Sequence, residues 1–104
     1  MIYRTVVSTS DLADHLDSTW VIVDCRYDLQ REDWGAEQYR SGHVPGAVYV
    51  RLSEDLAGTA TGTNGRHPLP PPEHMAALFG RLGIASGLQV VAYDQDLGMY
   101  ASRL

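Results

Sequence analysis

The chain has 104 residues, of which 44% are hydrophobic and 20% charged, a composition that fits one globular domain spanning residues 1–104. Its net charge of −5 comes from acidic residues spread along the chain, and no cluster of Lys and Arg could neutralise a phosphate backbone, so no nucleic acid partner is expected. No apolar run approaches the ~20 residues that span a bilayer, and the N-terminus lacks a basic segment followed by an apolar one. We therefore expect a soluble, cytoplasmic protein with no membrane partner.

The first elements in chain order are a weak strand, a capped helix and a strong strand. Ile2–Val7 alternates weakly and predicts a short strand at best. Ser8, with Asp11 three residues later, forms a capping-box pattern, so a helix should follow and end at residues 17–19. Trp20–Val23 is continuously apolar, which is typical of a strand covered by helices on both faces. This strand runs out into Asp24–Arg26.

The middle of the chain contains a helix, a tight turn and a strand. Glu32–Ser41 has the pattern of a short amphipathic helix. Gly42 is expected to close this helix in the left-handed conformation, and Pro45 cannot continue it. Ala47–Val50 is rich in β-branched and aromatic residues, which favours a strand. His43 is thereby held in a turn at the edge of the predicted sheet.

The second half begins with a long connection. Leu52–Pro72 is rich in Gly, Thr and Pro, and its length indicates a mobile segment or part of a site, with Arg66 beside a histidine. From Pro71 the apolar residues recur at helical spacing until Gly83. Leu88–Tyr93 predicts another buried strand, and Met99–Leu104 begins a helix.

This order of elements predicts an α/β fold, with a doubly wound parallel sheet and helices on both faces. In such sheets ligands bind outside the carboxyl ends of the strands. Two of those ends are Asp24–Arg26 and Asp94–Gly98, so these segments are the first candidates for a functional site.

Several motifs resemble the rhodanese-like sulfurtransferases, in particular the N-terminal domain of the two-domain thiosulfate and 3-mercaptopyruvate enzymes. They span most of the chain and keep the order of that family: Val21–Tyr27, Gly42–Val48, Gly65–Pro70, Leu82–Ile84 and Val90–Arg103. The resemblance implies a doubly wound α/β domain, which agrees with the order of elements. It also implies transfer of sulfane sulfur from a small anionic donor, thiosulfate or 3-mercaptopyruvate, to a thiol or cyanide acceptor.

Two departures from the family pattern qualify that expectation. Catalytic members carry a cysteine after the strand that matches Leu88–Tyr93, in a loop whose amides hold the transferred sulfur, whereas this chain has Asp94. This segment is therefore expected to be inactive alone, with the persulfide-forming cysteine in a second rhodanese-like domain or another subunit. Family domains also continue beyond the position of Leu104, so the fold is expected to be incomplete at its C-terminus, with Leu88–Tyr93 as an open apolar edge.

Cys25 is the single cysteine, so the chain can form no internal disulfide. A spacing of five residues separates it from Arg31, as in phosphatases of a related fold, so a nucleophilic thiol is one interpretation. The loop lacks glycine, and Asp24 and Asp28 would oppose both a thiolate and a phosphate. A buried thiol at a strand end is the favoured interpretation, and the phosphatase is the less favoured one.

The remaining candidates have a structural and a functional interpretation. Asp24 and Arg26 are expected to brace the strand end as an ion pair rather than to carry chemistry. His43 is a general base or cleft-facing donor in one interpretation, and a ring locked to backbone carbonyls in the favoured one. Arg66 could bind an anionic ligand or lie solvated in its loop. No metal site and no cofactor are expected.

The leading hypothesis is a sulfurtransferase domain that supplies one wall of a substrate cleft through His43 and Arg66. The alternative, from another functional class, is a non-catalytic binding or scaffold module. A second rhodanese-like unit with a cysteine at the strand exit, encoded beyond Leu104, would distinguish the two.

Overall fold

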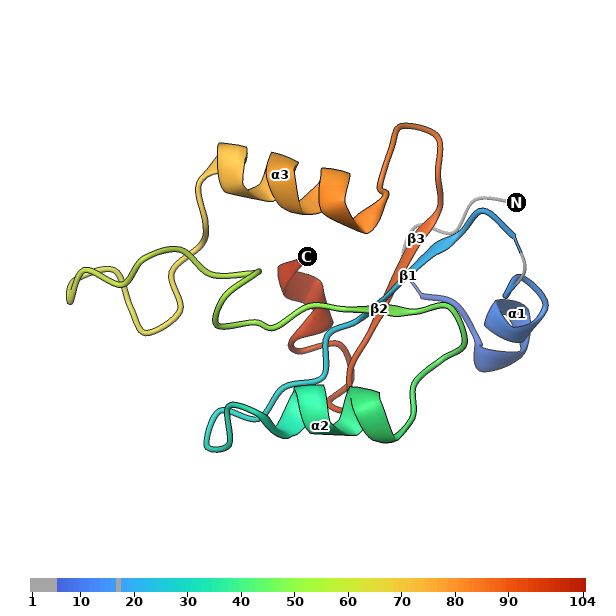
Figure 1. Ribbon diagram of the computed structural model, residues 1–104, viewed down its shortest axis with the longest axis horizontal. Coiled ribbons are helices and arrows are strands. Elements are labelled where there is room, and N and C mark those ends of the chain that lie inside the picture. Colours follow the sequence, from blue (N-terminus) through green and yellow to red (C-terminus); the bar gives the residue numbers. More distant parts are fainter. Residues whose placement is uncertain (1–5, 17) are drawn as a thin grey trace.

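The computed structural model describes residues 6–16 and 18–104, and its centre is a three-stranded parallel sheet (Figure 1). The strands are β1 (Val21–Asp24), β2 (Val48–Tyr49) and β3 (Val90–Tyr93), in the order β2-β1-β3. Val23 of β1 lies opposite Val48 of β2 and Ala92 of β3. The predicted α/β class with a parallel sheet is confirmed.

Among the described residues, four helical segments surround the sheet. They are α1 (Thr9–Ala13), α2 (Trp34–Ser41), α3 (Pro72–Leu82) and the 3₁₀ turn η1 (Ala101–Arg103). The limits of α3 agree closely with the sequence pattern, because proline is suited to the first turn of a helix and a glycine at φ 81° ends it. Ser8 caps α1 as expected, accepting the N–H of Asp11 on its side chain.

The alternation of side chains along the strands separates two packed layers. Val48 is partly buried and packs against the main core cluster, whose fully buried members include Val23 of β1 and Leu78 of α3. The next residue, Tyr49, points to the other face, where its ring lies 5.6 Å from that of Tyr39 on α2. Helices α2 and α3 accordingly lie on opposite sides of the sheet (Figure 1).

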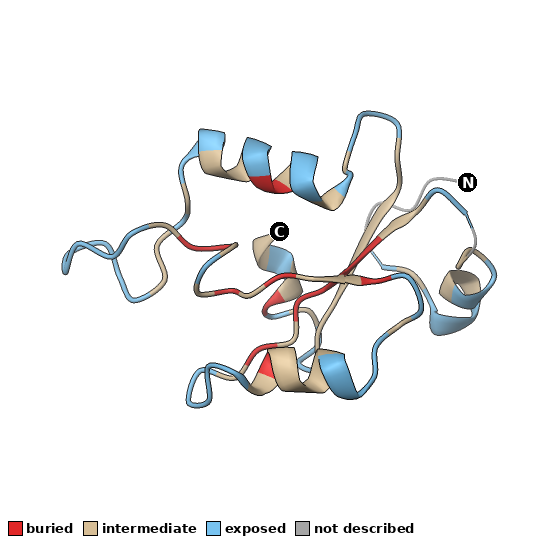
Figure 2. Ribbon diagram, in the orientation of Figure 1, coloured by how far each residue is buried: buried red, intermediate tan, exposed pale blue. Residues whose placement is uncertain are grey.

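The buried residues concentrate along β1 and along the segments that follow β1 and β2 (Figure 2). Val23 and Leu56 are fully buried, and the long connection that was expected to be a mobile loop or part of a site begins with this core segment before it becomes exposed. Gly35 lies where α2 approaches the end of β1, and a Cβ built there would come within 1.9 Å of the Arg26 carbonyl oxygen. Only glycine allows this approach of backbone to backbone.

Several sequence predictions differ from the structure. Gly42 does not adopt the left-handed conformation: its φ of 172° is extended, and the positive φ of 81° occurs at Gly46 instead. Helix α1 ends at Ala13, and the main-chain N–H of His15 bonds the Leu12 carbonyl instead of continuing the α-helical pattern to Asp11. The Asp11 carbonyl oxygen accepts the ring Nδ1 of His15, whose ring stacks 4.1 Å from that of Trp20. The strand expected over Ile2–Val7 falls mainly outside the described residues, and its last two residues are not in a strand.

The remaining elements begin later than the patterns indicated. Helix α2 starts two residues inside the expected Glu32–Ser41, and β3 starts two residues inside Leu88–Tyr93. The helix expected over Met99–Leu104 is a single 3₁₀ turn.

Within residues 6–16 and 18–104, no helix is both long and apolar enough to cross a membrane.

Candidate functional site

The candidate site lies where β1 and β3 end side by side. The last residues of the two strands, Asp24 and Tyr93, are paired in register, and because the strands are parallel both chains leave the sheet at the same edge. Beyond β1 the chain continues through Cys25 and Arg26, and beyond β3 it enters the loop that starts at Asp94.

The loop after β3 wraps around the carboxylate of Asp94. One oxygen, Oδ1, accepts the main-chain N–H groups of Asp96 and Gly98 at 2.8 and 2.9 Å. The other, Oδ2, accepts those of Tyr100 and Ala101, both at 2.7 Å. Main-chain amides of one loop that converge in this way form an anion-binding concavity. Here a side chain of the loop itself fills it.

The four N–H groups around Asp94, from Asp96, Gly98, Tyr100 and Ala101, form a cradle that favours the ionised form of the carboxylate. Burial raises the pKa of Asp94, but hydrogen bonds from the four N–H groups outweigh that effect and hold the pKa below its usual value. Leu97 adopts a positive φ of 57° within the loop, followed by Gly98 at 89°. The loop therefore bends tightly around an anion that is permanently present at neutral pH.

A buried ionic network braces the end of β1. The Asp24 side chain is completely buried, and the Arg26 guanidinium donates to both of its oxygens, with the shortest contact at 2.7 Å, from Nη2 to Oδ2. The Arg26 main-chain N–H and the Tyr93 hydroxyl also donate to this carboxylate, at 3.0 and 2.9 Å. Burying a charge is costly unless it is paired and hydrogen-bonded, and this one has four donor groups from two strand ends.

The same network holds the turn that carries His43. Arg26 donates to the Gly42 carbonyl oxygen at 2.7 Å, and the N–H of Val44 donates to the Tyr93 hydroxyl at 3.2 Å. Burial, with the neighbouring Asp24 adding to it, raises the pKa of Tyr93 to about 12, so the hydroxyl stays protonated. The residues on both sides of His43 are thus tied to the ends of β1 and β3.

The imidazole of His43 is exposed but fixed in orientation. Its Nδ1 donates to the Tyr39 carbonyl oxygen at 2.7 Å, because a carbonyl can only accept, and the two rings stack at 3.7 Å. The hydroxyl of Tyr39 in turn donates to the carbonyl of Ala47 at 2.6 Å. The geometry combines both interpretations of this histidine: one ring nitrogen is locked to the backbone, and Nε2 has no hydrogen-bond partner among the described residues.

Cys25 lies beside the cradle but is not accessible. Its exposed fraction is 1%, and burial, with the charges of Asp24 and Asp94 added, raises the pKa of the thiol to about 12. A nucleophilic cysteine needs an accessible thiolate stabilised by positive charge or amide donors. The amides that could supply this stabilisation converge on Asp94 instead.

Arg66 is exposed and linked to the loop after β1, where it donates to the Leu29 carbonyl oxygen at 2.8 Å. Its neighbour His67 contacts Tyr27 edge to face, and burial, followed by the charges of Arg66 and Arg103, lowers the pKa of this histidine. The structure thus brings the long connection to the same edge of the sheet. No group of three side chains suited to hold a metal ion occurs within residues 6–16 and 18–104.

Two features of this site were missed by sequence reasoning. Tyr93 appeared only as the last apolar residue of a strand, and its hydroxyl joins Asp24 to the His43 turn. The four amides around Asp94 carry no sequence signal except Gly98, whose type indicates a bend without indicating which way the N–H groups point.

Comparison with known proteins places these features in a family. The profile of the rhodanese-like domain matches residues 8–103. The solved structure of 3-mercaptopyruvate sulfurtransferase from Leishmania major superposes with a TM-score of 0.85 at 36% identity, over 93% of this chain and 27% of that one.

Relatives by sequence carry similar names. A Pseudomonas aeruginosa protein named "Probable 3-mercaptopyruvate sulfurtransferase" is 39% identical over 84 residues, which cover 80% of this chain and 30% of the relative. The thiosulfate sulfurtransferase of the same organism is 33% identical over 98 residues, covering 94% of this chain and 32% of the relative. The chain therefore matches less than a third of the length of these proteins.

Proposed function

This chain belongs to the rhodanese-like domain family, the family of the thiosulfate and 3-mercaptopyruvate sulfurtransferases, and from that premise we propose that it acts as a non-catalytic sulfurtransferase domain. In the proposed reaction a cysteine thiolate outside this segment takes up, as a persulfide, either the outer sulfur of thiosulfate, with cleavage of the S–S bond, or the thiol sulfur of 3-mercaptopyruvate, with cleavage of the C–S bond and protonation of the carbon. The donor leaves as sulfite or pyruvate. A thiol or cyanide then attacks the outer sulfur and regenerates the thiolate.

The observation that carries this proposal is the filled cradle. Four backbone N–H groups bind the two oxygens of Asp94, where a catalytic domain needs a thiolate that can form a persulfide. A carboxylate has no sulfur to accept, and its charge repels an anionic donor. The one thiol present, Cys25, is buried and has a raised pKa, which supports placing the reactive cysteine elsewhere.

The contribution of this domain to a substrate cleft is proposed for two side chains. His43 is exposed, with its ring orientation fixed and Nε2 turned away from the backbone bond, so it can accept a proton from, or donate one to, a ligand. Arg66 is exposed at the same edge of the sheet and keeps donor groups beyond its bond to Leu29. An anionic sulfur donor matches the charge of the arginine.

A sulfur-transfer assay tests the proposal directly. The purified chain is incubated with thiosulfate and cyanide, and thiocyanate is measured for the wild type and for Cys25→Ser. We expect no turnover above the uncatalysed rate in either protein. Turnover that disappears in Cys25→Ser would overturn the proposal, because it would make the buried thiol the sulfur carrier.

A binding or scaffold module is a second candidate that the filled cradle also favours, since such a module needs no reactive thiol. The two functions differ in what accompanies the domain. Sequencing the gene beyond the codon for Leu104 decides between them: a second rhodanese-like unit with a cysteine at the strand exit supports the sulfurtransferase. Its absence, together with no cysteine-bearing partner subunit in a native purification, supports the module.

A further inference from the structure

The side chain of Tyr39 bridges the two sides of the turn that carries His43. Tyr39 belongs to the last turn of α2, and its hydroxyl donates to the carbonyl oxygen of Ala47 at 2.6 Å, just before β2 begins. The N–H of Ala47 closes the turn by donating to the Val44 carbonyl oxygen at 2.9 Å. The ring of Tyr39 is therefore fixed at both ends, by the helix and by the entry to the strand.

Two contacts with Tyr39 hold the imidazole of His43. Its Nδ1 donates to the main-chain carbonyl oxygen of Tyr39 at 2.7 Å. The two rings are also stacked, with their centroids 3.7 Å apart and an angle of 9° between their planes. The stacked phenol ring keeps the imidazole in the orientation in which Nδ1 meets the carbonyl. Neither contact involves Nε2, which lies at the other corner of the imidazole.

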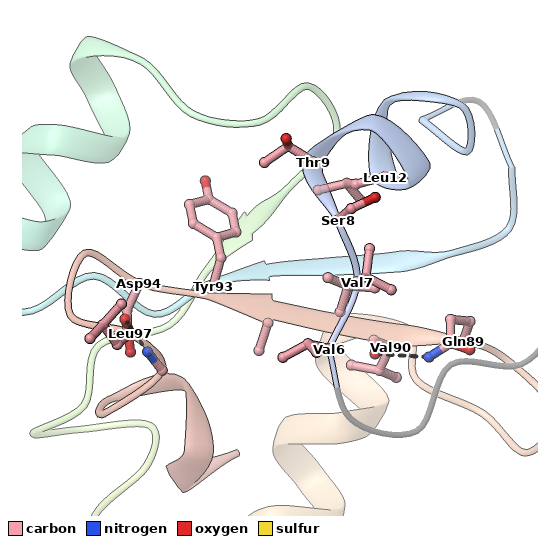
Figure 3. Close-up of a pocket in the computed structure, with 13 residues that line it drawn as sticks. Val6, Val7, Ser8, Thr9, Leu12, Gln89, Val90, Tyr93, Asp94 and Leu97 are labelled. Atoms are coloured by element: carbon pink, nitrogen blue, oxygen red, sulfur yellow. Dashed lines mark hydrogen bonds between the residues drawn. The ribbon is translucent and has the colours of Figure 1, made fainter.

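The backbone of the turn is held from the sheet, independently of the stacked ring. Figure 3 shows Tyr93 projecting from the end of β3 on the side of the sheet where α2 lies. Its hydroxyl accepts the Val44 N–H at 3.2 Å, and Arg26 donates to the Gly42 carbonyl oxygen at 2.7 Å. The two peptide groups that flank His43 are thus fixed by the ends of β1 and β3. Loss of the stacked ring should therefore release the imidazole and leave the turn in place.

The contacts of the ring decide between two neutral forms of His43. In a neutral imidazole one nitrogen is a donor and the other an acceptor, and the hydrogen bonds of the ring set which of them carries the proton. A histidine ring without a partner at Nδ1 carries its proton mainly on Nε2 in water. Stacking of two aromatic rings favours the stacked arrangement by roughly 2- to 13-fold over an unstacked one. In this turn the stacked arrangement is the one that places Nδ1 against a carbonyl oxygen.

We propose that Tyr39 is a positioning residue that keeps neutral His43 in the Nδ1–H form, so that Nε2 presents a lone pair. The use of that lone pair by a ligand rests on the proposed function, whereas the position of the proton follows from the geometry. In this form Nε2 accepts a hydrogen bond and cannot donate one. A thiol acid supplies the matching S–H donor together with an anionic group for Arg66. Thiosulfate carries no proton at neutral pH and does not match this nitrogen.

NMR of the nitrogen-labelled chain tests the position of the proton. Long-range proton–nitrogen correlations recorded at about pH 8.5, where histidine side chains are neutral, distinguish the two ring nitrogens. His43 should show the Nδ1–H form. His74 is the opposite reference, because its Nε2 meets the Asp55 carbonyl oxygen at 2.9 Å. His15 is a reference of the same form outside this turn, because its Nδ1 meets the Asp11 carbonyl oxygen at 2.8 Å.

Two variants test the role of Tyr39. Tyr39→Leu removes the ring and should lower the ratio of the Nδ1–H to the Nε2–H form at His43 at least ~3-fold, with no change at His15 or His74. Tyr39→Phe keeps the ring and should keep the ratio within about twofold of the wild type. Cooperative urea unfolding shows that each variant is folded. A ratio that is unchanged in Tyr39→Leu, or that falls equally in both variants, would overturn the proposal.

The wild type alone keeps the proposal falsifiable if Tyr39→Leu does not fold. A proton found mainly on Nε2 of His43 would overturn it, as would ring protons of His43 without the upfield shift that a stacked phenol ring causes. A titration with 3-mercaptopropionate, which has a thiol and a carboxylate, tests the ligand separately. Movement of the Nε2 signal of His43 supports its place in the cleft. A signal that does not move contradicts that part of the proposed function, while the ratios still decide the role of Tyr39.

Discussion

Replacing Asp94 by asparagine tests whether the loop after β3 is organised around a carboxylate. The amide keeps the shape of the side chain and one oxygen, but the other oxygen becomes an NH₂ group that can only donate. Since each oxygen accepts two main-chain N–H groups, two of the four lose their acceptor and face a donor instead.

The expected loss follows from those two bonds. A hydrogen bond to a charged group contributes about 1.5–3 kcal/mol, so two are worth roughly 3–6 kcal/mol when fully buried. Asp94 is only partly buried, and water can replace part of the interaction, which lowers the expected loss of unfolding free energy to about 1–3 kcal/mol. In a domain of this size each kcal/mol corresponds to a shift of ~4–8 °C in the melting temperature.

Urea denaturation of the wild type, Asp94→Asn and Asp96→Asn measures the effect. Asp96 is the matched control, since it lies in the same loop, is exposed, and accepts only a long contact of 3.4 Å on its side chain. We expect its replacement to change stability by less than about 0.5 kcal/mol. Equal losses in the two variants would refute a specific role for the Asp94 carboxylate.

The pH dependence supplies an independent check with a defined sign. The folded-state pKa of Asp94 lies below its unfolded value, so its stabilisation is complete above the unfolded pKa of about 3.9 and is lost as the pH falls through the folded value. The difference in stability between wild type and Asp94→Asn should therefore be constant near neutral pH and shrink below about pH 4. A difference that grows on acidification would contradict the hydrogen-bonding arrangement.

Three further predictions concern the packing and chemistry of this edge. Gly35→Ala should lower the free energy of unfolding by at least ~2 kcal/mol in urea denaturation, because the new Cβ would meet the Arg26 carbonyl oxygen at 1.9 Å. Its control is Gly80→Ala in α3, where the new Cβ would have open space, and this change should raise the free energy of unfolding by ~0.5–1 kcal/mol. Cys25 should react with iodoacetamide at pH 7.4 at least 10³-fold more slowly than a free thiol, because burial raises its pKa from 9.0 to about 12. Alkylation of the folded chain at the rate of a free thiol would show that the Cys25 thiol is accessible to solvent. Tyr93→Phe should lower the free energy of unfolding by about 1–3 kcal/mol and change the NMR shifts of the imidazole in the adjacent turn, and unchanged shifts would show that the hydroxyl does not hold this turn.

Local patterns predicted most of the elements, because their signals lie in neighbouring residues. The helical spacing between Pro71 and Gly83 gave α3 with both of its ends, and Ser8 identified the cap of α1. Gly42 shows the limit of such reasoning: glycine permits the left-handed conformation without requiring it, and the chain there is extended. Arg26 bonds the Gly42 carbonyl from across the turn, an interaction that no local pattern contains.

By itself the sequence determined the α/β class, the family and the presence of Asp94 at the strand exit, where the family resemblance implies a cysteine in catalytic members. Tertiary structure alone decided what surrounds that carboxylate and which side chains share its edge. Tyr93 reaches Asp24 across 69 positions and Val44 across 49, and these contacts exist only because parallel strands bring their ends together in one register. The direction of each main-chain N–H likewise depends on loop dihedral angles that are settled when the loop closes on its anion, since residue types constrain those angles only weakly.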